Sequence, residues 1–175
     1  ERKSALFPNG YKIVEEGLCG RTTIFEDELR DNRRGIDMLP ALLESHSPID
    51  YVILMLGTND CKTYYNASAG LIGKGIEKLI SQIKKYDSSL DILLMSPIVL
   101  GDEVWKPEFD PEFNKNSVKT SHKLKDVYKK IADKYGCHFL AASDVSSYST
   151  DDMEHMDASG HRHLADAILD LGLFA

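Results

Sequence analysis

An aspartate and a histidine near the carboxyl end of the chain have the spacing of a catalytic acid–base pair. In DMEHMDASGH, residues 152–161, Asp152 precedes His155 by three positions. A carboxylate that bonds one ring nitrogen fixes the imidazole tautomer and leaves the other nitrogen free to accept a proton from a nucleophile. The pair therefore predicts nucleophilic catalysis and requires a nucleophile elsewhere. Both residue types are also common on surfaces, and the neighbouring Asp151 could bond the imidazole instead.

Two glycine-containing segments upstream could stabilise an oxyanion. In GTND, residues 57–60, Asn59 is a neutral donor on a short, stiff side chain, which suits a developing negative charge. In GLCGRTT, residues 17–23, Gly20 could offer an unobstructed backbone N–H to the same oxygen. Each residue also has an ordinary structural explanation, because Asn-Asp pairs and glycines are both frequent in the turns that follow strands.

Short apolar runs alternate with longer helical patterns. The runs YKIVEE, YVILMLG, DILLMS and CHFLAA predict strands over residues 11–16, 51–57, 91–96 and 137–142. The second and third runs are almost continuously apolar, which is typical of parallel strands that are covered on both faces.

Apolar residues at helical spacing lie between these runs. The sequence predicts a short helix over Ile36 to Leu43, two longer helices over residues 72–83 and 118–135, and a last helix from about Ala158, capped by Asp157. The order of strand and helix predicts an α/β fold with a parallel sheet, right-handed crossovers and helices on both faces. We see no internal repeat or linker, so residues 1–175 are expected to form a single domain.

The segments with chemical potential all follow a predicted strand. In an open parallel sheet, ligands bind beyond the carboxyl ends of the strands. GLCGRTT, GTND and the Asp152/His155 segment should therefore lie at one edge of the sheet. A long irregular stretch, residues 97–113, carries Trp105 and follows the third predicted strand, so it should border the same edge. Loops of this length are often functional.

The composition narrows the class of protein. The chain has 175 residues, of which 42% are hydrophobic and 28% charged, as in ordinary globular domains. A net charge of −7 without a basic block argues against nucleic acid as a partner. No apolar run is long enough to cross a membrane. Three scattered cysteines predict neither disulfides nor a zinc knuckle, so a cytoplasmic location is expected.

Three segments together resemble a known family. GLCGRTT, GTND and DMEHMDASGH resemble blocks II, III and V of the SGNH hydrolases, also called GDSL esterases and lipases. The runs EEGLCGRTT and ESHSPIDYVILMLGTND are most similar to its arylesterase and acyltransferase branch. The resemblance extends over nearly the whole chain from Tyr11 onward. It implies a flavodoxin-like three-layer α/β/α sandwich and hydrolysis of small acyl esters, or acyl transfer to an alcohol, through an acyl-serine intermediate and without a cofactor.

The resemblance also implies roles for four residues. Gly20 and Asn59 correspond to the oxyanion-hole residues of the family, and Asp152 and His155 correspond to the acid and base of its catalytic triad. The expected partner is a small-molecule ester. Neither nucleic acid nor a membrane is expected as a partner, and assembly into a homo-oligomer stays open.

The nucleophile of the family has no counterpart in this sequence. The family carries it in a G-D-S turn after the first strand, and residues 1–175 contain no such turn and no G-x-S-x-G elbow. Ser4 has neither a preceding strand nor an adjacent glycine, and Ser96 ends a predicted strand but precedes a proline, which disfavours it. Cys61 directly follows GTND and is a conceivable cysteine nucleophile, although a small buried side chain is the simpler explanation.

The predicted sheet has a matching gap. The family has five strands, whereas this sequence predicts four, and the one without a counterpart lies inside the family's sheet. A sheet without an interior strand would leave two rows of backbone groups unpaired. We therefore expect the chain to be part of a longer protein whose first strand and nucleophile lie upstream.

Two other functions fit parts of the pattern. A non-catalytic module on the same fold could bind an acyl or carbohydrate group through Gly20, Asn59 and His155. A metal-dependent hydrolase could use Asp152, His155 and His161, but His161 and His163 lie two residues apart on a predicted helix and point to different faces. We expect no metal site.

Overall fold

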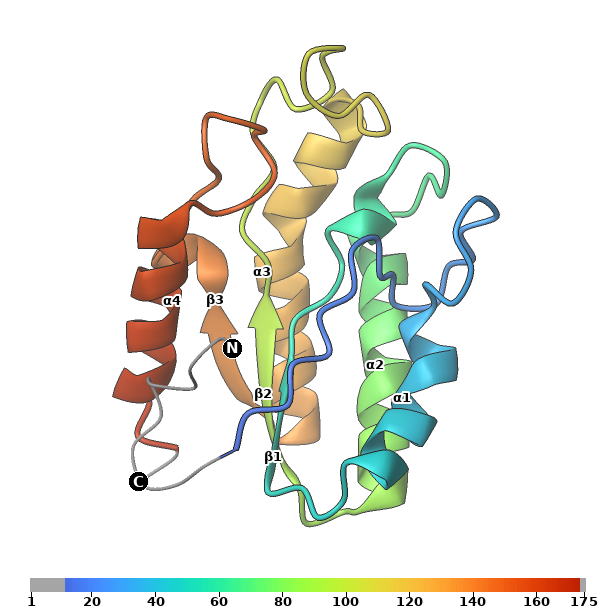
Figure 1. Ribbon diagram of the computed structural model, residues 1–175, viewed down its shortest axis with the longest axis vertical. Coiled ribbons are helices and arrows are strands. Elements are labelled where there is room, and N and C mark those ends of the chain that lie inside the picture. The colour runs from blue at the N-terminus through green and yellow to red at the C-terminus, as the bar shows by residue number, and fades with distance from the viewer. Residues whose placement is uncertain (1–11, 174–175) are drawn as a thin grey trace.

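The computed structural model describes residues 12–173, which form an α/β fold around a parallel sheet (Figure 1). Its strands are β1 (Tyr51–Leu54), β2 (Asp91–Ser96) and β3 (His138–Ala141), in the spatial order β1-β2-β3. Three predicted strands are therefore confirmed, two of them with shorter bounds. The predicted parallel α/β class is confirmed as well.

Four α-helices lie among the described residues. They are α1 (Gly35–Ser45), α2 (Ala69–Tyr86), α3 (Lys115–Tyr135) and α4 (Ala158–Asp170), and two short 3-10 helices follow strands at Asn59–Cys61 and Ala142–Asp144. The predicted cap of the last helix is confirmed, because the Asp157 carboxylate accepts a hydrogen bond of 2.7 Å from the Gly160 N–H. Such a cap typically contributes about 1 kcal/mol.

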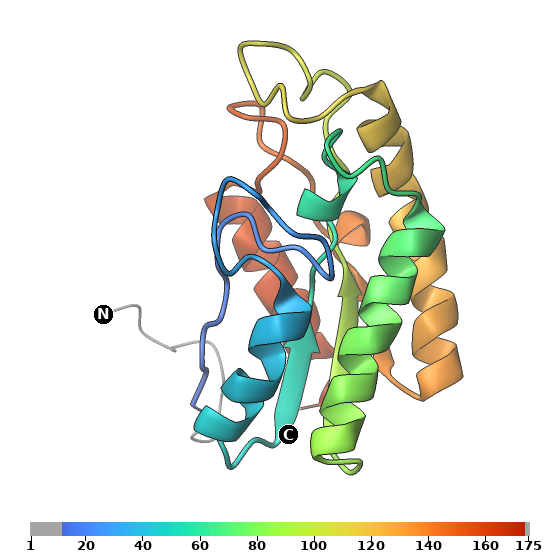
Figure 2. The ribbon, with the colours of Figure 1, turned by 90° about the vertical axis from the view of Figure 1, so that its right-hand side faces the viewer.

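The sheet lies between two helical layers, and the strand β2 shows why. Its residues alternate: Ile92 and Leu94 belong to the apolar core beneath α2 and α3, while Leu93 and Met95 pack with Leu164 of α4. Figures 1 and 2 show α4 on one face of the sheet and α2 and α3 on the other. Since both faces are covered, every residue of β2 after Asp91 is buried, as its apolar run predicts.

Helix α1 contains a proline that a side chain from α2 compensates. Pro40 has no N–H, so the carbonyl of Ile36, four residues earlier, loses its usual helical donor. The side chain of Gln82 donates a hydrogen bond of 2.7 Å to that carbonyl. This bond also fixes α1 against α2. The helix begins at Gly35, close to its predicted start.

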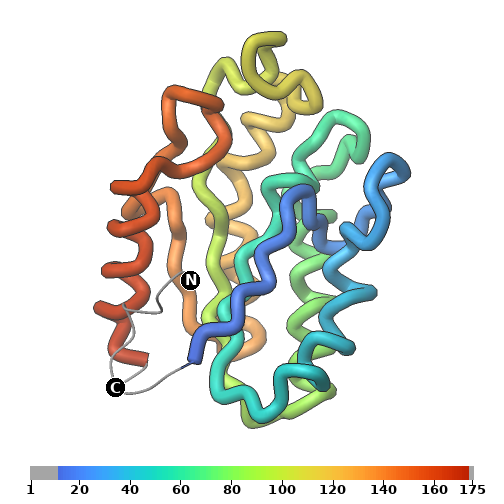
Figure 3. The backbone as a smooth tube through the Cα atoms, in the orientation of Figure 1, coloured from blue at the N-terminus to red at the C-terminus, as the bar shows by residue number. Residues whose placement is uncertain are grey.

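The strand predicted over residues 11–16 is wrong for the part that is described. Tyr11 lies outside the described residues, and residues 12–16 form no strand. Figure 3 shows residues 12–18 crossing in front of β1, and Figure 2 shows that they stand apart from the sheet. A strand exists only where a neighbour about 4.8 Å away exchanges backbone hydrogen bonds with it. Among the described residues, β1 forms its ladder with β2 alone.

The face of β1 on the side of α4 is uncovered. Ile53 pairs in register with Leu93, so both side chains project to the same face. Leu93 is only 3% exposed beneath α4, whereas Ile53 is 42% exposed. Ile13 and Val14 of the neighbouring segment are also largely exposed. This face of β1 thus presents apolar side chains that residues 12–173 leave partly exposed.

In the part of the chain that the structure describes, no helix combines the length and the apolar content that crossing a bilayer requires.

Candidate active site

The four segments singled out in the sequence meet at the carboxyl ends of the strands. Figure 1 shows the loops that follow β1, β2 and β3 at the same end of the molecule, together with the loop that precedes α1. Hydrogen bonds join them in pairs. The Asn59 side chain donates to the Arg21 carbonyl at 3.2 Å, and the Gly101 N–H donates to the Met153 carbonyl at 2.8 Å. The predicted common edge is therefore confirmed.

Asp152 and His155 are in direct contact. Oδ2 of Asp152 lies 2.9 Å from Nδ1 of His155, while Oδ1 accepts hydrogen bonds from the N–H groups of Glu154, at 2.9 Å, and His155, at 2.8 Å. Met153 between them adopts a left-handed conformation with φ of 59°. One carboxylate thus holds both the backbone and the imidazole, which leaves Nε2 as the ring nitrogen available for proton transfer.

The surroundings of this pair keep Asp152 ionised. Burial tends to raise the pKa of Asp152. The hydrogen bonds from the N–H groups of His155 and Glu154, together with the imidazole, outweigh this effect, so the pKa of Asp152 lies below its ordinary value. Of the two candidate carboxylates, Asp152 is the one in contact with the imidazole, and Asp151 is exposed. The His155 side chain is 68% exposed, so a substrate or a nucleophile can reach it.

Gly20 lies in a tight turn in which its backbone has a positive φ. The Arg21 N–H donates to the Leu18 carbonyl at 3.0 Å, and Gly20 has φ of +78°. A side chain is disfavoured there twice over, because a Cβ atom would also come within 3.0 Å of the Arg30 guanidinium. Gly20 is buried, yet its N–H has no acceptor among residues 12–173. Buried N–H groups without a partner are rare and suggest that something else binds there.

Asn59 is held in one orientation. Its Nδ2 atom carries two hydrogens, one of which bonds the carbonyl of Arg21, the residue after Gly20. The other hydrogen is left to bind a ligand atom. The amide of Asn59 and the N–H of Gly20 are therefore fixed to the same short segment, as a preorganised pair of donors requires.

Asp60 is a further acidic residue to which the sequence pattern alone assigned no role. It is fully buried, and both of its oxygens accept the N–H of Thr23, at 2.9 and 3.1 Å, while the Thr23 hydroxyl donates to Oδ1. The sequence signal that could have indicated a role for Asp60 was an acidic residue shortly after an apolar strand. A carboxylate buried at such a place needs hydrogen-bond donors from the protein.

The buried position of Asp60 predicts a pH-dependent contribution to stability. Burial raises the pKa of Asp60 from 3.8 to about 6, although its bonds with Thr23 lower it. An acid whose pKa is raised on folding favours the folded state when protonated, and that contribution is lost as pH rises through about 6. Asp60→Asn keeps the Oδ1 acceptor and cannot ionise. Between pH 4 and pH 7 the stability of Asp60→Asn relative to the unchanged protein should therefore rise by up to about 3 kcal/mol.

Denaturant unfolding at several pH values measures this difference. The exposed Asp91 at the opposite edge serves as a control, because Asp91→Asn should shift the stability difference by well under 1 kcal/mol over the same range. A difference between the Asp60→Asn and unchanged proteins that does not vary with pH would contradict the prediction.

Charged side chains surround the Gly20 turn. Arg30 pairs with Asp27 at 2.8 Å, and the Lys62 ammonium, only 7% exposed, pairs with Glu112. Beside His155, burial raises the pKa of Glu154, and the Asp110 charge adds to this rise while His155 and Lys62 oppose it. The spacing of these residues in the sequence did not predict this network, because they come from four separate loops.

The two other chemistries considered from the sequence find little support in the geometry. Cys61 is buried, its Sγ lies 3.4 Å from the Gly57 carbonyl, and burial raises its thiol pKa, so the nucleophilic thiolate is disfavoured. Within residues 12–173, no three His, Cys, Asp or Glu side chains are grouped as metal ligands.

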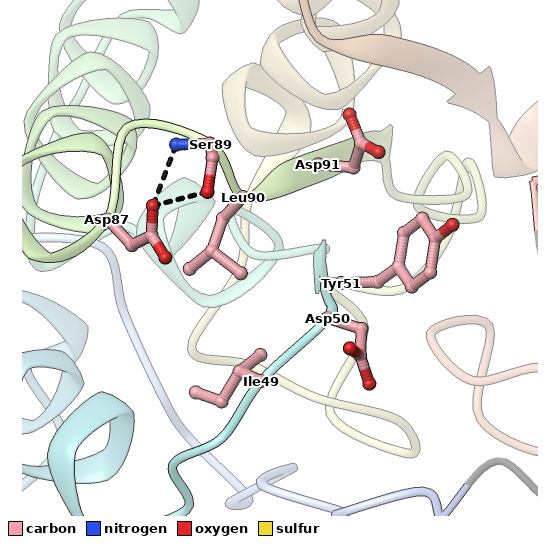
Figure 4. A pocket seen from close by; sticks show the side chains of 7 residues that line it. All are labelled: Ile49, Asp50, Tyr51, Asp87, Ser89, Leu90 and Asp91. Carbon is pink, nitrogen blue, oxygen red and sulfur yellow. Dashed lines mark hydrogen bonds between the residues drawn. The ribbon is translucent and has the colours of Figure 1, made fainter.

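A surface pocket of about 370 Å³ lies away from this site, at the amino ends of β1 and β2 (Figure 4). It is lined by residues 49–51, Asp87 and residues 89–91, three of which are exposed or half-buried aspartates. Ligands of parallel α/β sheets bind at the other edge, so this pocket is not part of the candidate active site.

Solved structures of esterases are similar to this chain. Est24, a carbohydrate acetylesterase from Sinorhizobium meliloti, is 34% identical with a TM-score of 0.87, and the match covers 96% of this chain and 80% of Est24. The inhibitor-bound M. smegmatis aryl esterase is 28% identical with a TM-score of 0.89, over 96% of this chain and 80% of the esterase. No similar protein was found among curated proteins.

A family model describes the same relationship at the level of sequence. The model of the GDSL-like lipase/acylhydrolase family matches residues 3–168, which include Gly20, Asn59, Asp152 and His155. Together with the esterase structures, this match supports hydrolase activity on esters. The resemblance seen in the sequence is thereby confirmed, and the chain belongs to the GDSL-like lipase/acylhydrolase family.

Proposed function

We propose that this protein hydrolyses carboxylic esters with small acyl groups through a Ser-His-Asp triad. The observation that carries the proposal is the 2.9 Å contact between Asp152 and His155 at the edge where Gly20 and Asn59 each offer an unused N–H. An imidazole with a fixed tautomer and a pair of oriented donors are the two parts that acyl transfer needs besides a nucleophile.

The proposed reaction has two halves. His155 Nε2 accepts the serine proton while the serine oxygen attacks the ester carbonyl, and the carbonyl electrons move onto the oxygen that Gly20 and Asn59 bind. The tetrahedral intermediate then collapses, the carbon–oxygen bond to the alcohol breaks, and His155 returns the proton to the leaving alkoxide. In the second half, water attacks the acyl-serine while His155 accepts its proton, and the serine leaves as the proton returns to it. Each oxyanion donor contributes about 3 kcal/mol to lowering the barrier.

The serine is proposed to lie upstream of residue 1, at the end of a strand beside β1. Two independent observations support this position. The proposed acid and base need a nucleophile, and Cys61, the candidate beside Asn59, is buried with a raised pKa and is therefore disfavoured. One face of β1 and of the residue after it also leaves Ile53 and Met55 partly exposed, as expected where an additional strand and its flanking chain would pack.

The long loop between β2 and α3 is proposed to border the substrate. The indole N–H of Trp105 donates to the Asp102 carbonyl at 2.9 Å, and the Lys115 ammonium lies 5.1 Å from the centre of the ring. Gly101 of this loop bonds Met153 of the segment that carries the acid–base pair. A loop held in this way can limit access of water to the acyl-enzyme, which decides between hydrolysis and transfer to an alcohol.

Two measurements on the complete protein test the proposal. Release of nitrophenol from nitrophenyl acetate, compared with nitrophenyl esters of longer acids, measures activity and acyl preference. A serine-reactive fluorophosphonate, followed by peptide mass analysis, locates the nucleophile. A labelled serine and preference for acetyl support the esterase. Binding of acetylated sugars without turnover or labelling would instead support a non-catalytic module on the same fold.

Replacing Asn59 tests the oxyanion donor. Asn59→Ala should lower kcat for a small ester by about 10²-fold or more with little change in KM, because the free amide hydrogen bonds the oxyanion and not the ground-state carbonyl. Steady-state kinetics measures both constants. Since Asn59 also bonds Arg21, the thermal unfolding midpoint must be measured alongside. Normal specific activity in a smaller folded fraction would assign Asn59 a purely structural role.

A further inference from the structure

The segment that carries Gly20 is fixed on the side facing α1. The carbonyls of Thr22 and Thr23 accept the N–H groups of Gly35 and Ile36 at 2.9 and 3.0 Å, so this segment supplies acceptors for the first turn of α1. Arg34, the residue before that helix, makes no side-chain cap. The helix therefore depends on the segment, and the segment is positioned by the helix.

The same segment is packed closely against α2. A Cβ atom added at Gly75 would come within 2.2 Å of the Thr23 hydroxyl, so only glycine allows this approach. Thr23 itself is fully buried. Its hydroxyl and its N–H have no route to water and depend on one acceptor, the carboxylate of Asp60.

Asp60 connects the two halves of the oxyanion site. It directly follows Asn59 in the chain, and it binds Thr23, which lies three residues after Gly20. A second bond joins the same two segments, and here the Asn59 amide donates to the Arg21 carbonyl. The two connections make a short closed loop of bonds in which neither donor can move without breaking a buried hydrogen bond.

We propose that Asp60 is a positioning residue for catalysis, acting through Thr23 to hold Gly20 and Asn59 at the separation that the oxyanion requires. Asp60 does not touch the substrate in this proposal, since its side chain is fully buried and its oxygens bind Thr23. A displacement of about 1 Å in such donors lowers the rate far more than it changes ground-state binding. The proposal rests on the esterase function proposed above. Within that function, the buried Asp60 carboxylate positions the oxyanion donors.

Substitutions at both ends of this contact test the proposal in the complete protein. Asp60→Ala removes the acceptor, whereas Asp60→Asn keeps it. Thr23→Val removes the hydroxyl donor at nearly constant shape, whereas Thr23→Ser keeps it. Asp60→Ala and Thr23→Val should each lower kcat by about 10-fold to 100-fold with KM changed less than about threefold, and the two conservative variants should recover most of the loss. The double variant should lose less than the product of the single losses.

The control variant is Asp91→Ala, an exposed carboxylate at the opposite edge, with unchanged kinetics expected. Amide hydrogen exchange at Thr23, measured on folded protein, reports the contact without any turnover. Faster exchange at Thr23 in Asp60→Ala, with its loss in kcat, supports the proposal. A loss of activity that only follows the folded fraction, or equal kcat in Thr23→Val and Thr23→Ser, would overturn it. An inactive unchanged protein would refute the esterase function, while unaltered exchange in Asp60→Ala would refute the positioning role separately.

Discussion

The complete protein with His155 replaced by alanine is expected to lose at least about 10³-fold in kcat for a small activated ester, with its fold intact. The base must take a proton from the nucleophile and give it to the leaving group, and loss of either transfer raises the barrier by several kcal/mol. The His155 side chain is 68% exposed, so its removal should cost little stability. Steady-state kinetics and thermal unfolding measure the two quantities together.

Asp152 and Asp151 provide a matched pair of controls for this prediction. Asp152→Asn should also lower kcat strongly, because an amide at this position can favour the wrong imidazole tautomer. Asp151→Asn removes a neighbouring exposed carboxylate that does not contact the ring, and it should leave kcat within about threefold. A His155→Ala variant that keeps a tenth of the original rate would place the base elsewhere. A larger loss in Asp151→Asn than in Asp152→Asn would mean that the contact seen here is not the catalytic one.

The parts of the fold that the sequence predicts well are those that local pattern determines. The buried strand β2 is continuously apolar because helices cover both of its faces, and α2 shows isoleucines and leucines at helical spacing because one face meets the core. The contact between Asp152 and His155 is equally local, since three residues and one left-handed turn bring the groups together.

The parts that the sequence did not predict depend on distant partners. YKIVEE has the pattern of a strand, but its described residues, 12–16, join no ladder with β1, β2 or β3 and so form no strand. Asp60 could be read as the end of a turn, because its partner Thr23 lies 37 positions away in the chain. Gln82 could be read as a surface residue, because only the structure shows the carbonyl that Pro40 leaves without a donor.

A protein that consists of residues 1–175 alone is expected to show no esterase turnover, while the protein that includes an upstream strand ending in a G-D-S turn should be active. The reason is chemical, since the proposed site assigns a base, an acid and oxyanion donors to the described residues but places the nucleophile upstream of them. Esterase assays on the two proteins at equal concentration measure the difference. Turnover by residues 1–175 that disappears in His155→Ala would place the nucleophile within them.

Ile53 offers a test of the same prediction that does not depend on activity. In residues 1–175 this side chain is 42% exposed on the uncovered face of β1, so Ile53→Asp should destabilise the protein by about 1 kcal/mol or less. If an upstream strand and its flanking chain cover β1, the same substitution in the longer protein buries an unpaired carboxyl and should cost about 3 kcal/mol or more. Leu93→Asp is the matched control, because Leu93 pairs with Ile53 in register and is already covered by α4, so it should cost several kcal/mol in both proteins. An equally small cost of Ile53→Asp in both proteins would show that no strand packs beside β1, and the proposed position of the serine would then be wrong.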